Sequence, residues 1–178
     1  MRVISGRYKK INLDGFNIDG TRPTMDRVKE SMFAMIQNDI KDSIVLDLFA
    51  GSGGLGIEAL SMGAKICYFI DNNQIAINTI NNNLKKIKES NSKVLKMDYQ
   101  KALNYFIDNN LKFDLIILDP PYKNNYLNNI IQIIFDNGLL NDNGIIVCEY
   151  EDYELNYHKF NLYKQKEFGS KIVSILIK

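Results

Sequence analysis

Short apolar runs alternate with segments of helical period through the middle of the chain. The runs are IVLDLFA (44–50), KICYFID (65–71), KVLKMD (93–98), DLIILD (114–119) and GIIVCEY (144–150). Each is almost continuously apolar and has the length of a strand buried on both faces. Between them, apolar residues recur at helical spacing, as in Ile77, Ile80, Leu84 and Ile87, and in Leu127, Ile130, Ile131 and Ile134. This alternation predicts an α/β fold with a parallel, doubly wound sheet.

The two ends of the chain follow other patterns. Residues 159–168 and 171–178 are separated by Gly169-Ser170 and predict an antiparallel hairpin. At the other end, residues 2–13 and 14–20 resemble short strands with glycine turns, and Thr24 is placed to cap a following helix. We therefore expect a β-hairpin and helix extension over residues 1–40, packed on a main domain of residues 41–178.

Composition narrows the class of protein. The chain has 178 residues, of which 46% are hydrophobic and 24% charged, as in a soluble globular protein. Cys67 and Cys148 lie in apolar runs, which favours reduced core thiols over a disulfide or a metal site. No apolar stretch is long enough to span a membrane. We expect a cytoplasmic monomer that needs no metal.

The net charge is only +1, but basic residues gather at the start of the chain. The first ten residues contain no acid and four basic residues, Arg2, Arg7, Lys9 and Lys10. Such an arm can follow the phosphates of a nucleic acid, although an ordinary solvated surface has the same composition.

A glycine-rich loop follows the first main strand, in LDLFAGSGGLGIEAL. Gly51, Gly53 and Gly56 fit the pattern G-x-G-x-x-G, and Asp71 stands 20 residues after Gly51, at the end of the next strand. Glycines let a ligand approach the backbone, and the following helix offers free N–H groups. The acid at the end of the second strand can accept hydrogen bonds from ribose hydroxyls. The ordered pattern favours a nucleoside-cofactor site over a plain tight turn.

Two further acids bear on which cofactor binds. Asp47 lies just before the loop, where a carboxylate would oppose a pyrophosphate but suit the sulfonium and ammonium groups of S-adenosylmethionine. Asp98 ends the third strand and can receive an adenine amino group or cap the next helix.

The fourth strand ends in Asp119-Pro120-Pro121-Tyr122. Prolines lack an N–H and stop the sheet, so the carbonyls of Asp119 and Pro120 can turn to a ligand. A carboxylate, a carbonyl and the flat ring of Tyr122 together suit the exocyclic amine of a planar base. In a doubly wound sheet these residues face the same crevice as the glycine loop.

These segments resemble a known family. DPPY together with LDLFAGSGGLGIEAL is similar to class I S-adenosylmethionine-dependent amino-methyltransferases, which have a Rossmann-like fold. RVISGRYKKINL, TRPTMDRVKESMF, ALSMGA and the late FGS resemble the bacterial RsmD family of 16S rRNA guanine-N2 methyltransferases. The resemblance covers nearly the whole chain, and TRPTMDRVKESMF discriminates most.

The resemblance implies a seven-stranded, mostly parallel sheet of order 3-2-1-4-5-7-6. It implies S-adenosylmethionine as cofactor and a guanine (966 in the usual count) of 16S rRNA, within a small-subunit assembly, as substrate. The cofactor site would comprise Asp47, Phe49, Ala50, Gly51, Ser52, Gly53, Asp71, Asn72, Asp98, Tyr99, Arg22 and Thr24. Asp119, Pro120, Pro121 and Tyr122 would hold the base, and the RNA contacts would include Arg7, Lys9, Lys10, Arg22 and Tyr122.

Three other interpretations stay open at this point. An adenine-N6 methyltransferase would share Asp-Pro-Pro-Tyr, although a DNA-modifying one usually carries an additional target-recognition domain. An NAD-linked oxidoreductase explains the glycine loop but not Asp-Pro-Pro-Tyr, and His158 is the only histidine. A non-catalytic RNA-binding factor could keep the same fold.

Overall fold

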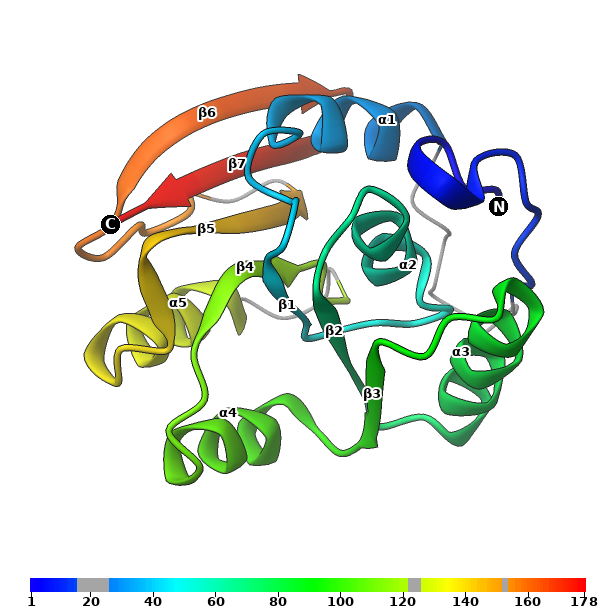
Figure 1. The fold of residues 1–178 in the computed structure, drawn as a ribbon. Helices are drawn as coiled ribbons and strands as arrows, with labels where there is room; N and C mark the ends of the chain where they lie inside the picture. Colours follow the sequence, from blue (N-terminus) through cyan, green and yellow to red (C-terminus); the bar gives the residue numbers. More distant parts are fainter. Residues whose placement is uncertain (16–25, 122–125, 152–153) are drawn as a thin grey trace.

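The sheet divides the molecule into two helical layers (Figure 1). The computed structural model describes residues 1–15, 26–121, 126–151 and 154–178. The strands are β1 (Ile44–Asp47), β2 (Ile66–Asp71), β3 (Ser92–Lys96), β4 (Phe113–Leu118), β5 (Leu140–Glu151), β6 (Asn161–Phe168) and β7 (Lys171–Ile177). The helices are α1 (Asp26–Met35), α2 (Gly54–Ser61), α3 (Gln74–Ile87), α4 (Tyr99–Asp108) and α5 (Tyr126–Asp136). A 3₁₀ helix, η1, spans Gly6–Tyr8.

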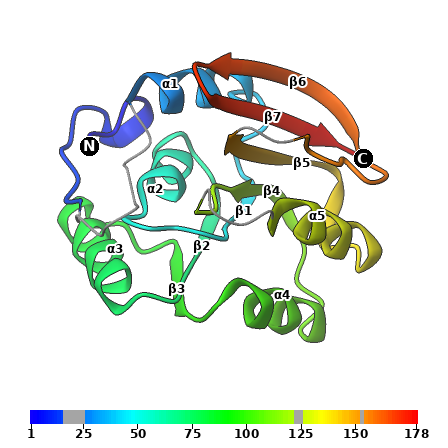
Figure 2. The ribbon, with the colours of Figure 1, turned by 180° about the vertical axis from the view of Figure 1, so that it is seen from behind.

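The predicted topology is confirmed. The strand order is β3-β2-β1-β4-β5-β7-β6. Strands β1 to β5 pair in parallel, and β7 pairs antiparallel with both β5 and β6. The C-terminal hairpin therefore extends the sheet at one edge, as seen in Figures 1 and 2.

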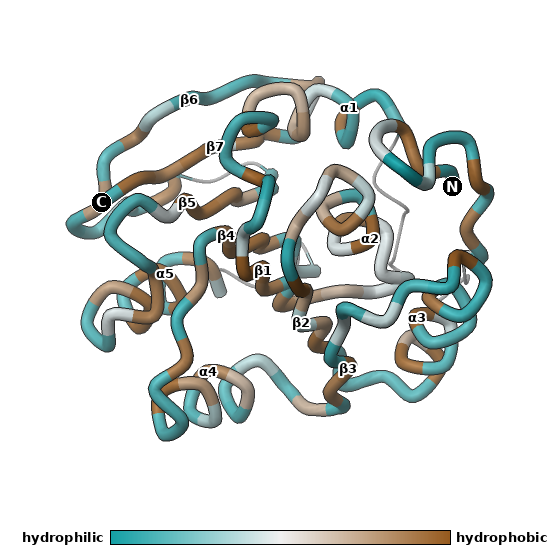
Figure 3. Tube along the Cα trace, in the orientation of Figure 1, coloured by the Kyte–Doolittle hydropathy of each residue, from teal (hydrophilic) through white to brown (hydrophobic). Residues whose placement is uncertain are grey.

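Both faces of the central strands are buried, as their continuous apolar runs predict. One core cluster joins α1, α2 and α3 to the sheet and includes Val45 and Ile117; the opposite one joins α4 and α5 and includes Leu46 and Leu118. Neighbouring strand residues enter different clusters because successive side chains alternate between faces. The brown strands at the centre of Figure 3 trace this core, while the edge strand β6 is mostly polar and exposed.

Two predicted strand limits are wrong. The first run continues to residue 50, but β1 ends at Asp47; Leu48 N still donates to Ile117 O at 3.2 Å and Ala50 N to Ile70 O at 2.9 Å, which ties the start of the loop to both neighbouring strands. The last parallel strand begins at Leu140 rather than residue 144, since Phe113 pairs with Leu140 before a register shift.

The N-terminal arm, residues 1–15, folds back on itself without forming the predicted strands. An isolated antiparallel bridge, Arg2 with Asn12, joins its two halves, together with backbone hydrogen bonds such as Val3 N to Ile11 O and Leu13 N to Met1 O, both 2.9 Å; η1 lies between the halves. Side chains of α2 take the place of a strand partner: the Glu58 carboxylate accepts the N–H of Ile4, and Ser61 Oγ accepts that of Tyr8 at 3.0 Å. Thr24, expected to cap α1, lies outside the described residues.

The helices themselves are short. Every helix that the structure describes is too short or too polar to span a lipid bilayer. Their apolar stripes are those predicted: Ile77, Ile80, Leu84 and Ile87 of α3, and Leu127, Ile130, Ile131 and Ile134 of α5, are buried.

Candidate active site

The predicted site residues meet at the carboxyl ends of the parallel strands. Asp47 is in register with Phe69 and Ile117, so Asp71 and Asp119 each lie two residues farther along the neighbouring strand. In the same way Asp71 is in register with Lys96, two residues before Asp98. The strand order reverses at this point: β2 and β3 follow on one side of β1, and β4 and β5 on the other. Ligands usually bind at the carboxyl ends of the strands next to such a reversal.

The glycine loop between β1 and α2 is fixed by its own backbone and by Asp71. One carboxylate oxygen of Asp71 accepts the N–H of Gly51 at 2.9 Å, and the other accepts the N–H of Asn73 at 2.8 Å. Gly53 precedes α2 at φ +83, a left-handed conformation that suits glycine. Partial burial raises the pKa of Asp71, although these backbone hydrogen bonds act to lower it. Each carboxylate oxygen still has a lone pair for a hydroxyl group.

Asp47 lies beneath the loop rather than on its surface. Its side chain is 1% exposed, and Oδ2 accepts the N–H of Gly56 at 2.9 Å, which satisfies an amide in the first turn of α2. Oδ1 has no hydrogen-bond partner within the described residues. Burial raises the pKa of Asp47 to about 7, and the charge of Asp71 adds to the rise. Gly56 also lets α2 approach the sheet, because a Cβ there would lie 2.3 Å from the Phe69 ring.

The third acid, Asp98, caps α4. Its Oδ1 accepts the N–H of Lys101 at 2.9 Å, and this bond, followed by the nearby Lys101 ammonium, lowers the pKa of the exposed carboxyl. The capping role is thus present, and it leaves the second oxygen able to accept another donor.

An aromatic cluster stands beside Asp98. The rings of Phe49 and Tyr99 lie 5.7 Å apart, those of Tyr99 and Tyr126 5.1 Å, and those of Phe49 and Tyr126 6.5 Å and nearly parallel. All three are half-buried. Sequence reasoning named Phe49 and Tyr99 but missed Tyr126, which follows the prolines and has no motif of its own.

The remaining loop residues lie as the chain order requires. Ala50 and Gly53 are buried, Gly51 and Ser52 are half-buried, and Asn72 is exposed. Beyond β4, Asp119 is half-buried, Pro120 is buried and Pro121 is exposed. Three predicted residues, Arg22, Thr24 and Tyr122, lie outside the described residues, and their roles stay predictions.

The basic arm divides into paired and unpaired residues. Arg7 forms an ion pair with Glu89 and packs on the Tyr8 ring, while Arg2 lies 3.4 Å from Asp26. Lys9 and Lys10 are exposed and form no ion pair with any residue that the structure describes. These two lysines are therefore the cations of the arm best able to meet an external anion.

Comparison with known proteins agrees with this geometry. The family Conserved hypothetical protein 95 matches residues 1–177. Ribosomal RNA small subunit methyltransferase D of Haemophilus influenzae is 35% identical, with 95% of this chain and 89% of that protein covered. The chain belongs to the RsmD family.

Two more relatives extend the agreement. YlbH of Bacillus subtilis is 43% identical over 85% of this chain and 83% of that protein. The structure of yhhF from Escherichia coli superposes with a TM-score of 0.85 at 29% identity, covering 99% of this chain and 96% of that one. Fold and family are those of methyltransferases.

This RsmD-family chain also contains a buried ion pair that sequence reasoning missed. Lys29 of α1 and Glu58 of α2 are 0% and 1% exposed, and Lys29 Nζ lies 3.0 Å from Glu58 Oε2. Lys29 also donates to Arg2 O at 2.6 Å. No local pattern reveals such a pair, because its members lie on two different helices with β1 between them in the chain.

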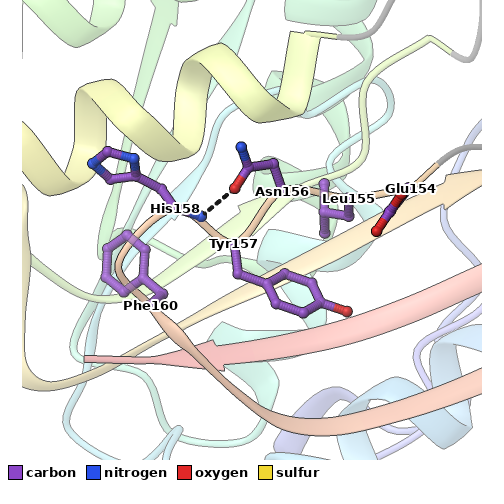
Figure 4. A pocket seen from close by; sticks show the side chains of 6 residues that line it. All are labelled: Glu154, Leu155, Asn156, Tyr157, His158 and Phe160. Atoms are coloured by element: carbon purple, nitrogen blue, oxygen red, sulfur yellow. Dashed lines mark hydrogen bonds between the residues drawn. The ribbon is translucent and has the colours of Figure 1, made fainter.

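A hollow on the RsmD-family fold lies apart from these residues (Figure 4). It is lined by one stretch between β5 and β6: Glu154, Leu155, Asn156, Tyr157, His158 and Phe160. His158 turns toward α5, with Nε2 3.4 Å from Asp136 Oδ1, while Tyr157 points the other way. None of the predicted site residues lines this hollow, and no metal-binding group of three acidic, histidine or cysteine side chains occurs within the described ranges.

Proposed function

We propose that the protein transfers a methyl group from S-adenosylmethionine to the exocyclic N2 of a guanine in 16S rRNA, the guanine-966 type, on a small-subunit assembly. The relatives named Ribosomal RNA small subunit methyltransferase D support the substrate class. The observation that carries the proposal is the meeting of the glycine loop and Asp119 at one edge of the sheet.

The residues of the edge fit this cofactor. Asp71 has lone pairs left for ribose hydroxyls, and Asp98 with Tyr99 can flank an adenine. Oδ1 of Asp47 has no hydrogen-bond partner among the described residues, and a positively charged ligand at the loop would favour the ionised form of this carboxyl. When bound, S-adenosylmethionine supplies a methyl group already activated by its sulfonium.

The other edge residues would hold the base. The Asp119 carboxylate and the Pro120 carbonyl are the proposed acceptors of the two amine hydrogens, which would aim the nitrogen lone pair at the cofactor. Alignment of this kind supplies about 7–11 kcal/mol of the barrier. Extracting a stacked base costs a few kcal/mol, and stacking on Tyr122 would return about 1–3 kcal/mol.

The N-terminal part would contact the RNA. In this proposal residues 1–40 form an extension of a methyltransferase domain of residues 41–178, and Lys9 and Lys10 contact phosphates. Reversing both charges should weaken RNA binding and reduce its salt dependence. Equal binding of variant and parent across a salt series would exclude an RNA role for these lysines.

Asp119→Ala tests the assignment of the base site. We expect methyl transfer to unmodified small subunits to fall about 10²–10³-fold, by analogy with the loss of one transition-state acceptor, while the Kd for S-adenosylmethionine changes little. Asp108→Ala is the matched control, because Asp108 is exposed at the far end of α4. Near-normal turnover of Asp119→Ala would refute the assignment.

The cofactor is tested separately by a rise in Tm with S-adenosylmethionine and not with NAD.

A further inference from the structure

The sequence 81–83 contains three consecutive asparagines on α3, and only one of them is buried. Asn81 and Asn82 are exposed, while Asn83 is 0% exposed. A buried primary amide is costly unless its donors and acceptor are satisfied. Specific hydrogen-bond partners must therefore stabilise Asn83 in its buried position.

Those partners belong to two segments far apart in the sequence. Asn83 Nδ2 donates to Ser52 O at 3.0 Å, in the middle of the glycine loop, and to Asp14 O at 2.9 Å. Asn83 Oδ1 accepts the N–H of Asp14 at 2.8 Å. One side chain thus joins the loop, α3 and the end of the N-terminal arm.

The contact with Ser52 fixes the carbonyl side of a peptide group whose N–H, that of Gly53, donates to Ala50 O at 2.7 Å. The carbonyl of Ser52 belongs to the peptide that leads into Gly53, and a glycine populates several backbone conformations at similar free energy. A buried amide donor selects the orientation in which this carbonyl points toward α3. The loop's other face then keeps one shape before any ligand arrives.

We propose that Asn83 is a positioning residue for the cofactor loop, and that it couples this loop to the N-terminal arm. The inference rests on the proposed function, because the ligand of the loop is taken to be S-adenosylmethionine. Asn83 acts through Ser52 and touches no reacting atom. Its loss should therefore affect the KM for S-adenosylmethionine much more than kcat.

Asn83→Asp is the sharpest variant, because it keeps size and the bond from Asp14 N but replaces the donor by an oxygen facing two carbonyls. We expect its Kd for S-adenosylmethionine, measured by calorimetry without RNA, to rise about tenfold or more. Asn82→Asp makes the same chemical change one residue away on the exposed face and should stay within about twofold. Hydrogen exchange should quicken at Gly53 N, which donates to Ala50 O at 2.7 Å.

A second variant separates positioning from folding. Asn83→Ser shortens the neutral side chain and should also raise the Kd and the KM, with native circular dichroism retained. Native-like binding by both Asn83 variants would overturn the inference, and so would loss of the native spectrum in both, since Asn83 would then act in folding. Failure of the parent protein to bind S-adenosylmethionine would instead overturn the proposed function.

Discussion

Two buried carboxylates that contact α2 or belong to it, Asp47 and Glu58, have different surroundings. Glu58 and Asp47 are each 1% exposed. Glu58 receives the Lys29 ammonium at 3.0 Å, the N–H of Ser5 at 2.7 Å and the N–H of Ile4. Asp47 receives only the N–H of Gly56 through one oxygen, and its other oxygen has no partner in the described part of the chain.

The difference separates a structural acid from a functional one. Burying a charge is unfavourable unless ion pairing and hydrogen bonds compensate for lost water. The buried charge of Glu58 is compensated by the Lys29 ammonium and by two backbone N–H groups of the arm. Through these contacts Glu58 holds the N-terminal arm and α1 to α2. Asp47 is compensated on one side only, next to the loop proposed to bind a cationic cofactor. We infer that Glu58 serves stability and that Asp47 serves the ligand.

The largest expected effect comes from breaking the compensated pair. Glu58→Gln leaves the Lys29 ammonium buried without its counter-charge, which should lower the free energy of unfolding by about 3–5 kcal/mol in urea titrations. The double variant with Lys29→Met should lose less than the sum of the two single losses, because the two sites interact. A loss below about 1 kcal/mol for Glu58→Gln would erase the contrast with Asp47.

Asp47 should instead make stability depend on pH. Its pKa rises from 3.8 to about 7 on folding, so between these values the native state keeps a proton that the unfolded state has released. The contribution of Asp47 to the free energy of unfolding should therefore be greatest in acid and fall by roughly 4 kcal/mol as pH rises from about 4 through about 7. Asp71, whose pKa is also raised, adds to the same slope.

Asp47→Asn isolates that contribution. The variant has no carboxyl to titrate at this position. The difference in free energy of unfolding between parent and variant should therefore change with pH as predicted for Asp47. Urea titrations at pH 4, 5, 6 and 7 measure it. Parallel stability curves for the two proteins would show that Asp47 does not titrate differently on folding.

A smaller effect is expected from the hydroxyl of Ser61, which binds the N-terminal arm beside Glu58. Ser61 Oγ donates to Ser5 O at 2.5 Å and accepts the N–H of Tyr8 at 3.0 Å. Ser61→Ala should cost about 1–3 kcal/mol, because two polar backbone groups lose a partner. No measurable loss in urea would mean that Ser61 does not help to anchor the arm.

The smallest effect should come from an exposed ion pair. Lys86 Nζ and Asp14 Oδ1 lie 3.1 Å apart, with side chains 44% and 59% exposed. Lys86→Ala should change the free energy of unfolding by less than about 1 kcal/mol. A loss as large as that of Glu58→Gln would show that burial is not what separates these pairs.

Local pattern predicts the strands of the main sheet and the helices between them. Continuous apolar runs identify strands buried on both faces, and the stripes of α3 and α5 identify the helices between them. The order of strands came from the resemblance to a family, because periodicity carries no information on which strands are neighbours. The position of Asp98 before a helix was sufficient to indicate its cap.

Long-range contacts could not be predicted in this way. Asn83 is indistinguishable in sequence from Asn81 and Asn82, and only packing against the arm and the loop selects it. Glu58 is likewise an ordinary acid of a short helix until the arm folds over it. The strand expected over residues 2–13 does not form for the same reason: side chains of α2 accept the N–H groups of Ile4 and Tyr8.

The central claim is methylation of a guanine amine in small-subunit RNA. The most direct test is to incubate the protein with labelled S-adenosylmethionine and unmodified small subunits, then identify the labelled nucleoside by mass spectrometry. The account predicts N2-methylguanosine with the parent protein and almost none with Asp119→Ala. Label in N6-methyladenosine, or equal label with both proteins, would contradict it.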